Sequence, residues 1–256
     1  MNEINIAIVT SHTTGYASLL LERIQSTKAS TTVCIINQPK KRSKLKTLKK
    51  IRQIGILGTL CGLILRNSYK NQFKSLGDIC KTKSIKIIRC KNFCLNEKDR
   101  KYLHQIDLGI SMGNGYIPKR FYTIFKYGMV NIHHELLPEY PGAQSIIWPI
   151  YFNRRNTGYS IHKINAKIDK GDILVREEYP ILFKKSLFET IHYNYRNSLL
   201  KSIDGIVDLL NSFDIIFNSP TKNRSNVAFT TPTLGQFLRI LINHYKICAT
   251  ENFSSK

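Results

Sequence analysis

The sequence predicts an α/β fold in which a doubly wound, mostly parallel sheet carries helices on both faces. Short apolar segments typical of strands alternate with segments in which apolar residues recur every three or four positions. Such alternation is typical of a parallel sheet that is covered on both sides. The chain has 256 residues and is 42% hydrophobic, so it can bury one substantial core together with a smaller appendage.

The first part of the chain predicts strand and helix units on either side of a basic insertion. The predicted strands are Ile4–Val9, Thr32–Ile36 and Ile85–Arg89, and the predicted helices are about Tyr16–Thr27 and Glu97–His104. The apolar run at the start is short and has no basic residue before it, so we expect a first strand and not a signal peptide. Between these units, residues 40–75 are expected to be helical in two pieces, broken around Gly55, Gly58 and Gly62.

The second part predicts further strands, a long helix and a C-terminal extension. The predicted strands are Leu108–Met112, Met129–Ile132, Gly158–Ile164 and Ile173–Tyr179, and the predicted helices are Ala143–Phe152, Leu187–Leu210 and about Thr233–Cys248. Ser186 is the expected N-cap of the long amphipathic helix. The polar stretch 218–226 is typical of an exposed linker. We therefore expect a core domain over residues 1–213 and a linker with a helical extension over 214–256.

Positive charge is concentrated in the insertion. The chain has 39 Lys and Arg against 17 Asp and Glu, a formal net charge of +22, and eight of the thirteen residues from Lys40 to Arg52 are basic. Such a block could be a solvated helix face, or it could bind a polyanion: a diphosphate-linked substrate, RNA or an anionic membrane. Leu45, Leu48 and Ile51 recur among the lysines, as in a basic helix that lies on a membrane.

No apolar stretch in the sequence predicts a membrane span. The longest, Ile54–Leu65, is shorter than the roughly 20 residues that crossing a bilayer requires. We therefore expect a cytoplasmic protein, which could associate peripherally with a membrane through residues 40–52. The six cysteines are scattered and are expected to be reduced thiols. Cys90 and Cys94 could hold a metal, but no second ligand pair accompanies them, so no metal site is predicted.

Three polar side chains suggest chemistry. Asn131 lies in the predicted strand Met129–Ile132, His133 directly follows it, and Asp169 lies in a loop between two predicted strands. Each alone is ordinary: a turn former, a hydrogen-bonded polar residue and a loop carboxylate. Together they offer an oxyanion donor, a proton carrier and an orienting group, which is what moving an acyl group requires. Because ligands of open parallel sheets bind beyond the carboxyl ends of the strands, we expect the site there.

The order and context of these residues resemble a known family. The segment Gly128–Ala143, which contains Asn-Ile-His-His-Glu-Leu-Leu-Pro, resembles the signature of the folate-dependent formyltransferases. The later segments Thr157–His162 and Asp169–Ile173 match the family's T-G-x-[ST]-[IV]-H strand and its D-x-G-[DP]-I loop. The resemblance is specific over about residues 104–180 and weaker over 1–37. One departure is that His134 and Glu135 replace the usual Pro-Ser.

The resemblance implies a Rossmann-like fold, a formyl transfer and a set of site residues. Asn131, His133 and Asp169 match the catalytic positions. N10-formyltetrahydrofolate would be the formyl-donating cosubstrate, bound by Met112, Gly113, Asn114, Gly115, Tyr116, Ile117, Pro118, Leu137, Pro138 and Asp172. The acceptor would contact Ser11, Thr13, Gly15, Glu135, Tyr140 and Gly142. Glu135 could hold an acceptor ammonium or face water.

The acceptor is expected to be a small anionic molecule bearing a primary amine. A core with a short C-terminal extension favours an amino sugar carried on a nucleotide or lipid phosphate. Glycinamide ribonucleotide stays open, since the stretch 11–16 has hydroxyls and a following helix that could bind phosphate. Methionyl-tRNA, and nucleic acid in general, is less favoured because no large C-terminal domain follows. Two other classes stay open: a formyltetrahydrofolate hydrolase, and a non-catalytic basic module that binds nucleic acid or membrane.

Overall fold

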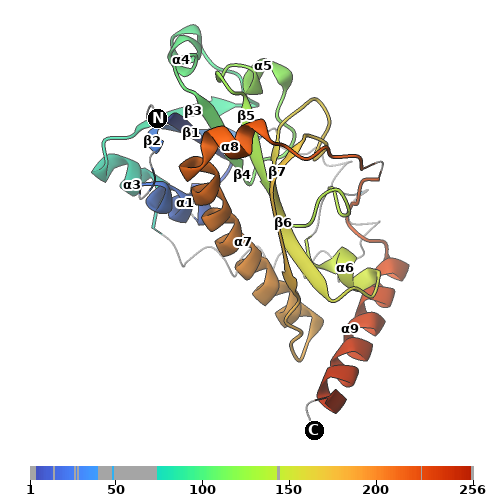
Figure 1. Cartoon of the computed structure of the whole chain (residues 1–256). Helices are drawn as coiled ribbons and strands as arrows, with labels where there is room; N and C mark the ends of the chain where they lie inside the picture. The colour runs from blue at the N-terminus through green and yellow to red at the C-terminus, as the bar shows by residue number, and fades with distance from the viewer. Residues whose placement is uncertain are drawn as a thin grey trace.

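A seven-stranded sheet is the centre of the computed structural model, which describes residues 4–13, 15–25, 27, 29–39, 48, 74–142, 145–225 and 227–254 (Figure 1). The strands are β1 (Ile4–Thr10), β2 (Ala29–Gln38), β3 (Lys86–Lys91), β4 (Leu108–Met112), β5 (Met129–His133), β6 (Asn156–Lys163) and β7 (Ile173–Pro180). Their order across the sheet is β3-β2-β1-β4-β5-β6-β7. The predicted helices of residues 40–75 lie almost entirely outside the described residues.

The sheet is parallel on one side and antiparallel on the other. The strands from β3 to β5 pair in parallel, whereas β6 and β7 pair antiparallel to their neighbours. The predicted mostly parallel α/β fold is therefore confirmed. The antiparallel register places Asn131 of β5 directly opposite His162 of β6, and directly opposite residues of an antiparallel pair have neighbouring side chains on one face.

Helices cover both faces of the parallel strands. One face packs against α1 (Tyr16–Ile24), α3 (Leu76–Thr82), α7 (Leu187–Asn211) and α8 (Phe213–Asn218), and the other against α4 (Glu97–Leu103) and α5 (Lys119–Tyr122). Along β1, Ile6 and Ile8 enter the first core, and Ala7 and Val9 enter the second. This alternation is the period of two that a strand imposes on its side chains.

A third apolar cluster joins the C-terminal helix to the rest of the chain. It contains Trp148 and Ile150 of α6 (Ile147–Tyr151), Leu187 at the start of α7, and Ile240 of α9 (Leu234–Ser254). The C-terminal helix expected at Thr233–Cys248 is thus present. In Figure 1, α9 lies at the periphery, beside α6 and away from the parallel strands. No helix in the described ranges has both the length and the apolar character that a membrane span requires.

Several boundaries differ from the predictions for local reasons. The helix predicted to reach Thr27 ends at Ile24, whose carbonyl accepts hydrogen bonds from the Thr27 backbone and hydroxyl. The helix predicted at Ala143–Phe152 is shortened to α6, because Ile146 has a φ of 71° that no α-helix tolerates. The helices α3, α5 and α8 were not predicted, since four to seven residues show too little periodicity.

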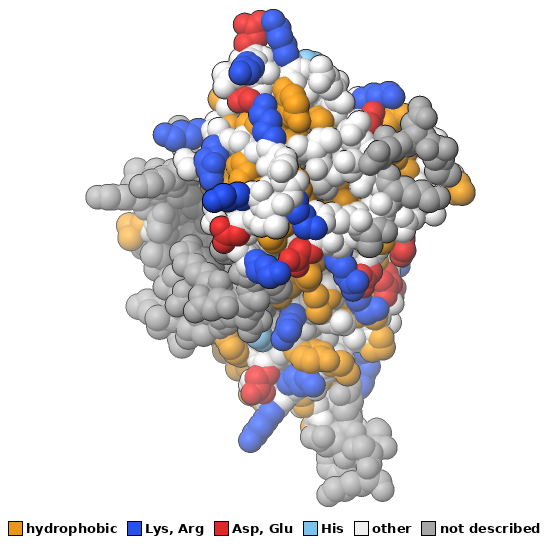
Figure 2. Space-filling model, turned by 90° about the vertical axis from the view of Figure 1, so that its left-hand side faces the viewer, with side chains coloured by type: hydrophobic (Ala, Val, Ile, Leu, Met, Phe, Trp, Pro, Cys, Tyr) orange, Lys and Arg blue, Asp and Glu red, His pale blue; other side chains and the backbone are white. Residues whose placement is uncertain are grey.

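The charge of the described surface is spread out. Figure 2 shows Lys and Arg side chains outnumbering Asp and Glu on the face that carries α1 and α3, with the two signs interspersed. Some of these charges are paired, as Arg23 is with Asp204 and Lys201 with Glu177. On the described residues, the excess positive charge therefore forms no single concentrated patch on this face.

The predicted N-cap of α7 gives a test of the fold. The Ser186 side chain accepts a hydrogen bond from the Glu189 backbone, and the Glu189 carboxylate accepts one from the Ser186 backbone. We expect Ser186→Ala to lower the free energy of unfolding, measured by urea titration, by about 1 kcal/mol, because the Glu189 backbone N–H loses its acceptor. Ser212 precedes α8 without a side-chain cap bond, so Ser212→Ala is the control. Equal losses in both variants would contradict the capping assignment.

Candidate active site

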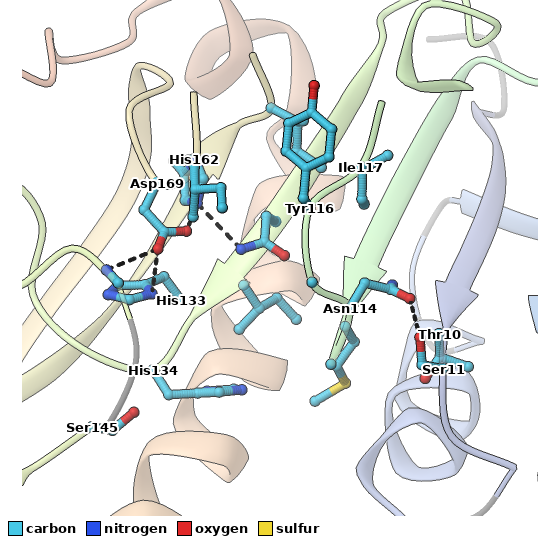
Figure 3. Close-up of a pocket in the computed structure, with 18 of the residues that line it drawn as sticks. Thr10, Ser11, Asn114, Tyr116, Ile117, His133, His134, Ser145, His162 and Asp169 are labelled. Carbon is cyan, nitrogen blue, oxygen red and sulfur yellow. Dashed lines mark hydrogen bonds and ion pairs between the residues drawn. The ribbon is translucent and has the colours of Figure 1, made fainter. Parts of the chain in front are cut away.

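A cavity of about 1130 Å³ opens at the carboxyl ends of β1, β4 and β5 (Figure 3). Its walls come from the turn before α1, the loop after β4, the end of β5, the loop between β6 and β7, helix α7 and residues 228–230. This is the edge of the sheet at which a ligand site was predicted. The cavity is larger than most small-molecule pockets, which hold roughly 300–1,000 Å³, so it has room for two ligands side by side.

Asp169 lies between two imidazole rings at one side of this cavity. Its Oδ2 atom is 3.8 Å from Nδ1 of His133, and its Oδ1 atom is 3.5 Å from Nε2 of His162 (Figure 3). Oδ2 also accepts a hydrogen bond from the backbone N–H of Gly142 at 2.9 Å. Asp169 has a φ of 51°, a conformation that is uncommon outside glycine and asparagine and often found at functional sites. The carboxylate therefore joins three segments that are distant in sequence.

A hydrogen bond to a backbone carbonyl defines which ring nitrogen of His133 carries the proton. Nε2 of His133 is 2.8 Å from the Tyr140 carbonyl oxygen. A carbonyl can only accept, so Nε2 carries the hydrogen and Nδ1 faces Asp169. Burial lowers the pKa of His133, and the opposing effect of the Asp169 charge does not cancel this shift. The neutral ring therefore keeps an electron pair on Nδ1 beside the carboxylate.

His162 is held in the same way and in turn orients Asn131. Its Nδ1 donates to the Lys163 carbonyl at 2.9 Å, which leaves Nε2 facing both Asp169 and the Asn131 amide. The Asn131 Nδ2 group lies 3.3 Å from Nε2 and donates to it when the ring is neutral. This contact turns the Asn131 amide nitrogen toward the cluster. His162 was not predicted as a site residue, although it ends the Thr157–His162 motif.

The Asp169 carboxylate is held in its charged form. Burial on its own would raise the pKa of Asp169, but the interactions of the carboxylate with His162 and His133 and the hydrogen bond from the Gly142 N–H together outweigh that effect. The pKa of Asp169 therefore lies below the ordinary value. At neutral pH the cluster contains an ionised carboxylate beside a neutral His133.

Most of the predicted ligand-binding residues line the cavity. Those that do are Met112, Gly113, Asn114, Gly115, Tyr116 and Ile117 after β4, Ser11, Thr13 and Gly15 near β1, and Gly142. The Asn114 side chain accepts from the Ser11 hydroxyl at 2.8 Å and donates to the Val9 carbonyl at 2.7 Å. It therefore fixes the predicted donor loop against the predicted acceptor loop.

Other predicted residues lie behind the cavity wall. Pro118, Leu137, Pro138, Asp172 and Tyr140 do not line it. Leu137 is fully buried, and Asp172 pairs with Lys222 at 3.0 Å. Tyr140 acts through its carbonyl on His133, and its ring packs against Phe229. None of these five residues lines the cavity as the structure describes it, and their contact with a ligand stays a prediction.

The structure differs from the prediction that Glu135 holds an acceptor ammonium or faces water. Glu135 is only 1% exposed and lies outside the cavity, so it neither faces water nor is placed to bind an acceptor. Its carboxylate accepts hydrogen bonds from the backbone N–H of Ile146 at 2.8 Å, from that of Leu136 at 3.1 Å and from the Thr157 hydroxyl at 3.0 Å. The carboxylate thereby stabilises the turn in which Ile146 has its positive φ. Its neighbour His134 lines the cavity instead, with its ring edge-to-face against Tyr195 (Figure 3).

The polar stretch 218–226, predicted as an exposed linker, overlaps a segment that is attached to the Asp169 loop. We call this attached segment, residues 221–225 and 227–229, the strap. The Asn223 side chain donates to the Asp169 carbonyl at 2.9 Å, and Nζ of Lys170 donates to the Ser225 and Val227 carbonyls, each at 2.6 Å. Although much of the strap is exposed, it is therefore tied to the loop that carries the carboxylate.

The end of the strap explains the glycine at 142. The Phe229 N–H donates to the Pro141 carbonyl at 2.7 Å, and Gly142 pairs with Phe229 in a β-bridge. Gly142 has a φ of 109°, and a side chain there would collide with the Phe229 backbone. Only glycine fits both constraints, and it also supplies the N–H that binds Asp169. The strap therefore closes one wall of the cavity at the point where the carboxylate is held.

Sequence comparisons relate residues 103–197 and the surrounding chain to known proteins. Residues 103–197 match the family described as Formyl transferase. The chain is 34% identical over 104 residues to GDP-perosamine N-formyltransferase of Brucella melitensis, covering 40% of this chain and 40% of that protein. It is 32% identical over 139 residues to methionyl-tRNA formyltransferase of Ehrlichia ruminantium, covering 53% of this chain and 44% of that protein. The matches confirm the resemblance, and each spans less than half the length of the relative.

Solved structures show the same fold. The N-formyltransferase of Helicobacter canadensis, in complex with folinic acid and dTDP-3-aminofucose, aligns with a TM-score of 0.55 at 21% identity, covering 88% of this chain and 70% of that one. Glycinamide ribonucleotide transformylase 1 of Symbiobacterium toebii aligns with a TM-score of 0.52 at 16% identity, covering 83% of this chain and 88% of that one. At such identities the likeness concerns the fold.

The buried Glu135 predicts a pH dependence of stability. Burial raises the pKa of Glu135 to about 7, from an ordinary value of 4.5. The native chain thus keeps this proton to a higher pH than the unfolded chain does, and this group lowers the free energy of unfolding as the pH rises from 4.5 to about 7. In Glu135→Gln this contribution should be absent. Urea titrations across that pH range measure the free energy of unfolding of the wild-type chain and of Glu135→Gln. A difference between the two free energies that stays constant with pH would contradict the assignment.

Proposed function

Because this chain belongs to the formyltransferases over residues 103–197, we propose that it transfers a formyl group from N10-formyltetrahydrofolate to a primary amine. The observation that carries the proposal is the Asp169 carboxylate within 4 Å of two imidazoles at the wall of the cavity. Asn131, His133 and Asp169 all line that cavity. An amide, an imidazole and a carboxylate together match the needs of acyl transfer to an amine.

The loop after β4 fits a folate donor. Residues 113–117 line the cavity with two glycines that leave the backbone accessible, while Met112, Ile117 and Ile164 offer apolar contacts. A bicyclic heteroaromatic ring with polar edges needs such a combination of backbone groups and apolar walls. When bound, the donor supplies a formyl carbon that an amine can attack.

The residues of the cluster would each meet one requirement of that attack. The Asn131 amide, oriented by His162, can donate to the oxygen that becomes negative, an effect worth about 10²–10³ in rate. Neutral His133 can take up a proton on Nδ1, where Asp169 stabilises the resulting positive charge. Asp169 can accept the amine proton directly or through water, and a proton would then pass to the donor nitrogen as its bond to the formyl carbon breaks. The low pKa of this carboxylate keeps it available for that task at neutral pH.

We propose that the acceptor is an amino sugar carried on a nucleotide or lipid phosphate. The similarity to a GDP-perosamine N-formyltransferase supports this class, as does the fold shared with a sugar N-formyltransferase. Beside the residues of the donor loop, the cavity wall carries the Ser11 and Thr13 hydroxyls, the His134 ring and the Tyr195 ring. Hydroxyls and aromatic faces suit a sugar and a base.

An acceptor screen tests this proposal. Formyl transfer from N10-formyltetrahydrofolate would be measured with nucleotide-linked amino sugars, glycinamide ribonucleotide and methionyl-tRNA, and formate release would be measured without an acceptor. We expect turnover with an amino sugar and little formate. Turnover with glycinamide ribonucleotide or methionyl-tRNA alone would reassign the acceptor. Formate release that stays the same when any of the amines is added would instead indicate a hydrolase.

Substitutions in the cluster test the assigned roles. We expect His133→Ala and Asp169→Asn each to lower kcat/KM for formyl transfer by at least about 10²-fold, because proton transfer loses its carrier or its charge partner. Circular dichroism and thermal unfolding would check that the fold is retained. Near-wild-type turnover by either folded variant would remove that residue from the mechanism.

A further inference from the structure

Helix α9 carries an apolar stripe that no described residue covers. Leu234 is 61% exposed, Leu238 50%, Ile242 54% and Tyr245 51%. Their spacing of four, four and three residues places all of them on one side of the helix. The stripe runs for about 17 Å along the helix at 1.5 Å per residue. The opposite side, with Ile240, His244 and Ile247, is buried against the rest of the chain, so α9 is apolar on two faces.

Positive charge accompanies the stripe along one edge. Residues 234–250 contain no Asp or Glu, and Arg239 and Lys246 are exposed beside the stripe. The turn after α6 lies along the same edge, because the Asn243 side chain donates to the Ile150 and Tyr151 carbonyls. This turn adds Arg155, which donates to the Thr250 hydroxyl at 3.0 Å, and the exposed Arg154 before it.

The four cations Arg154, Arg155, Arg239 and Lys246 all lie at the exposed surface. The Arg239 guanidinium lies over the Tyr151 ring at 4.6 Å, an aromatic contact that fixes its position without neutralising it. Two carboxylates near this turn, Glu139 and Glu178, share the Arg176 guanidinium, at 3.1 and 3.3 Å, so positive charge exceeds negative charge along the edge. The edge of the stripe is therefore a row of positive charge.

We propose that α9 docks with this stripe on the surface of an anionic phospholipid bilayer. An exposed apolar stripe with cations along its edge is the pattern of a helix that lies in the membrane interface. The apolar side chains would enter the boundary of the acyl chains, and Arg154, Arg155, Arg239 and Lys246 would meet the lipid phosphates.

Charge favours this occupant over a second copy of the chain. Two copies packed stripe to stripe would bring the same four cations against one another, in chains that each carry a formal net charge of +22. An anionic lipid surface supplies the opposite charge instead. The proposal does not depend on formyl transfer, since docking needs neither folate nor an acceptor.

The test is co-sedimentation of the full chain with vesicles of phosphatidylcholine mixed with phosphatidylglycerol, and with vesicles of phosphatidylcholine alone. We expect binding to the mixed vesicles only. Ile242→Glu should lower the partition coefficient at least about 10-fold, because it removes buried apolar area and adds repulsion. Ile215, on α8, is 70% exposed, so Ile215→Glu makes the same change elsewhere on the surface and should lower binding far less.

Three results would overturn the proposal. The wild-type chain could fail to sediment with the mixed vesicles, or Ile215→Glu could weaken binding as much as Ile242→Glu, which would assign the effect to net charge alone. Analytical ultracentrifugation without lipid could instead show a dimer that Ile242→Glu converts to monomer, which would assign the stripe to a second copy. Circular dichroism of both variants confirms that they are folded.

Discussion

The ionised carboxylate of Asp169 is the interaction on which the site depends. A buried charge is tolerated only where opposite charges and hydrogen-bond donors replace water. Here the Gly142 backbone N–H donates to the carboxylate, and the imidazoles of His133 and His162 lie within 4 Å of it. The strap meets the same loop through Asn223, which donates to the Asp169 backbone carbonyl. Holding this one carboxylate thus requires the end of β5, the end of β6 and the Gly142 turn to meet, while the strap holds the backbone of the loop that carries it.

Much of this could be predicted from the sequence, because strand patterns and short motifs are local. The apolar runs of β1, β4 and β5, the Ser186 cap and the residues Asn131, His133 and Asp169 were found where expected. The antiparallel direction of β6 and β7 was not predicted, since an apolar run has the same pattern beside a parallel or an antiparallel neighbour. The role of His162 depends on that direction, because only the antiparallel register of β6 puts it opposite Asn131.

Glu135 shows how a charged residue can mislead. A carboxylate next to a catalytic histidine suggests a contact with substrate, yet in the fold its side chain turns inward and binds the Ile146 N–H. Continued alternation would place Glu135 on the same side as His133, but β5 ends at His133, and beyond it His134 lines the cavity while Glu135 turns inward. For residues 218–226 the polar composition predicts the exposure that most of the described residues have, but it does not reveal that Lys170 binds the Ser225 carbonyl or that Asn223 binds the Asp169 carbonyl.

A crystal structure of the chain with a bound reduced formyl-folate tests the central claim most directly. The account predicts a formyl carbon about 3.5 Å from the Asn131 and His133 side chains, the separation of a reactive geometry, with the Asp169 carboxylate still between the two imidazoles. The pterin ring should contact the loop over residues 112–117. A folate bound away from this cluster, or a saturating folate that leaves the cavity empty, would contradict the account.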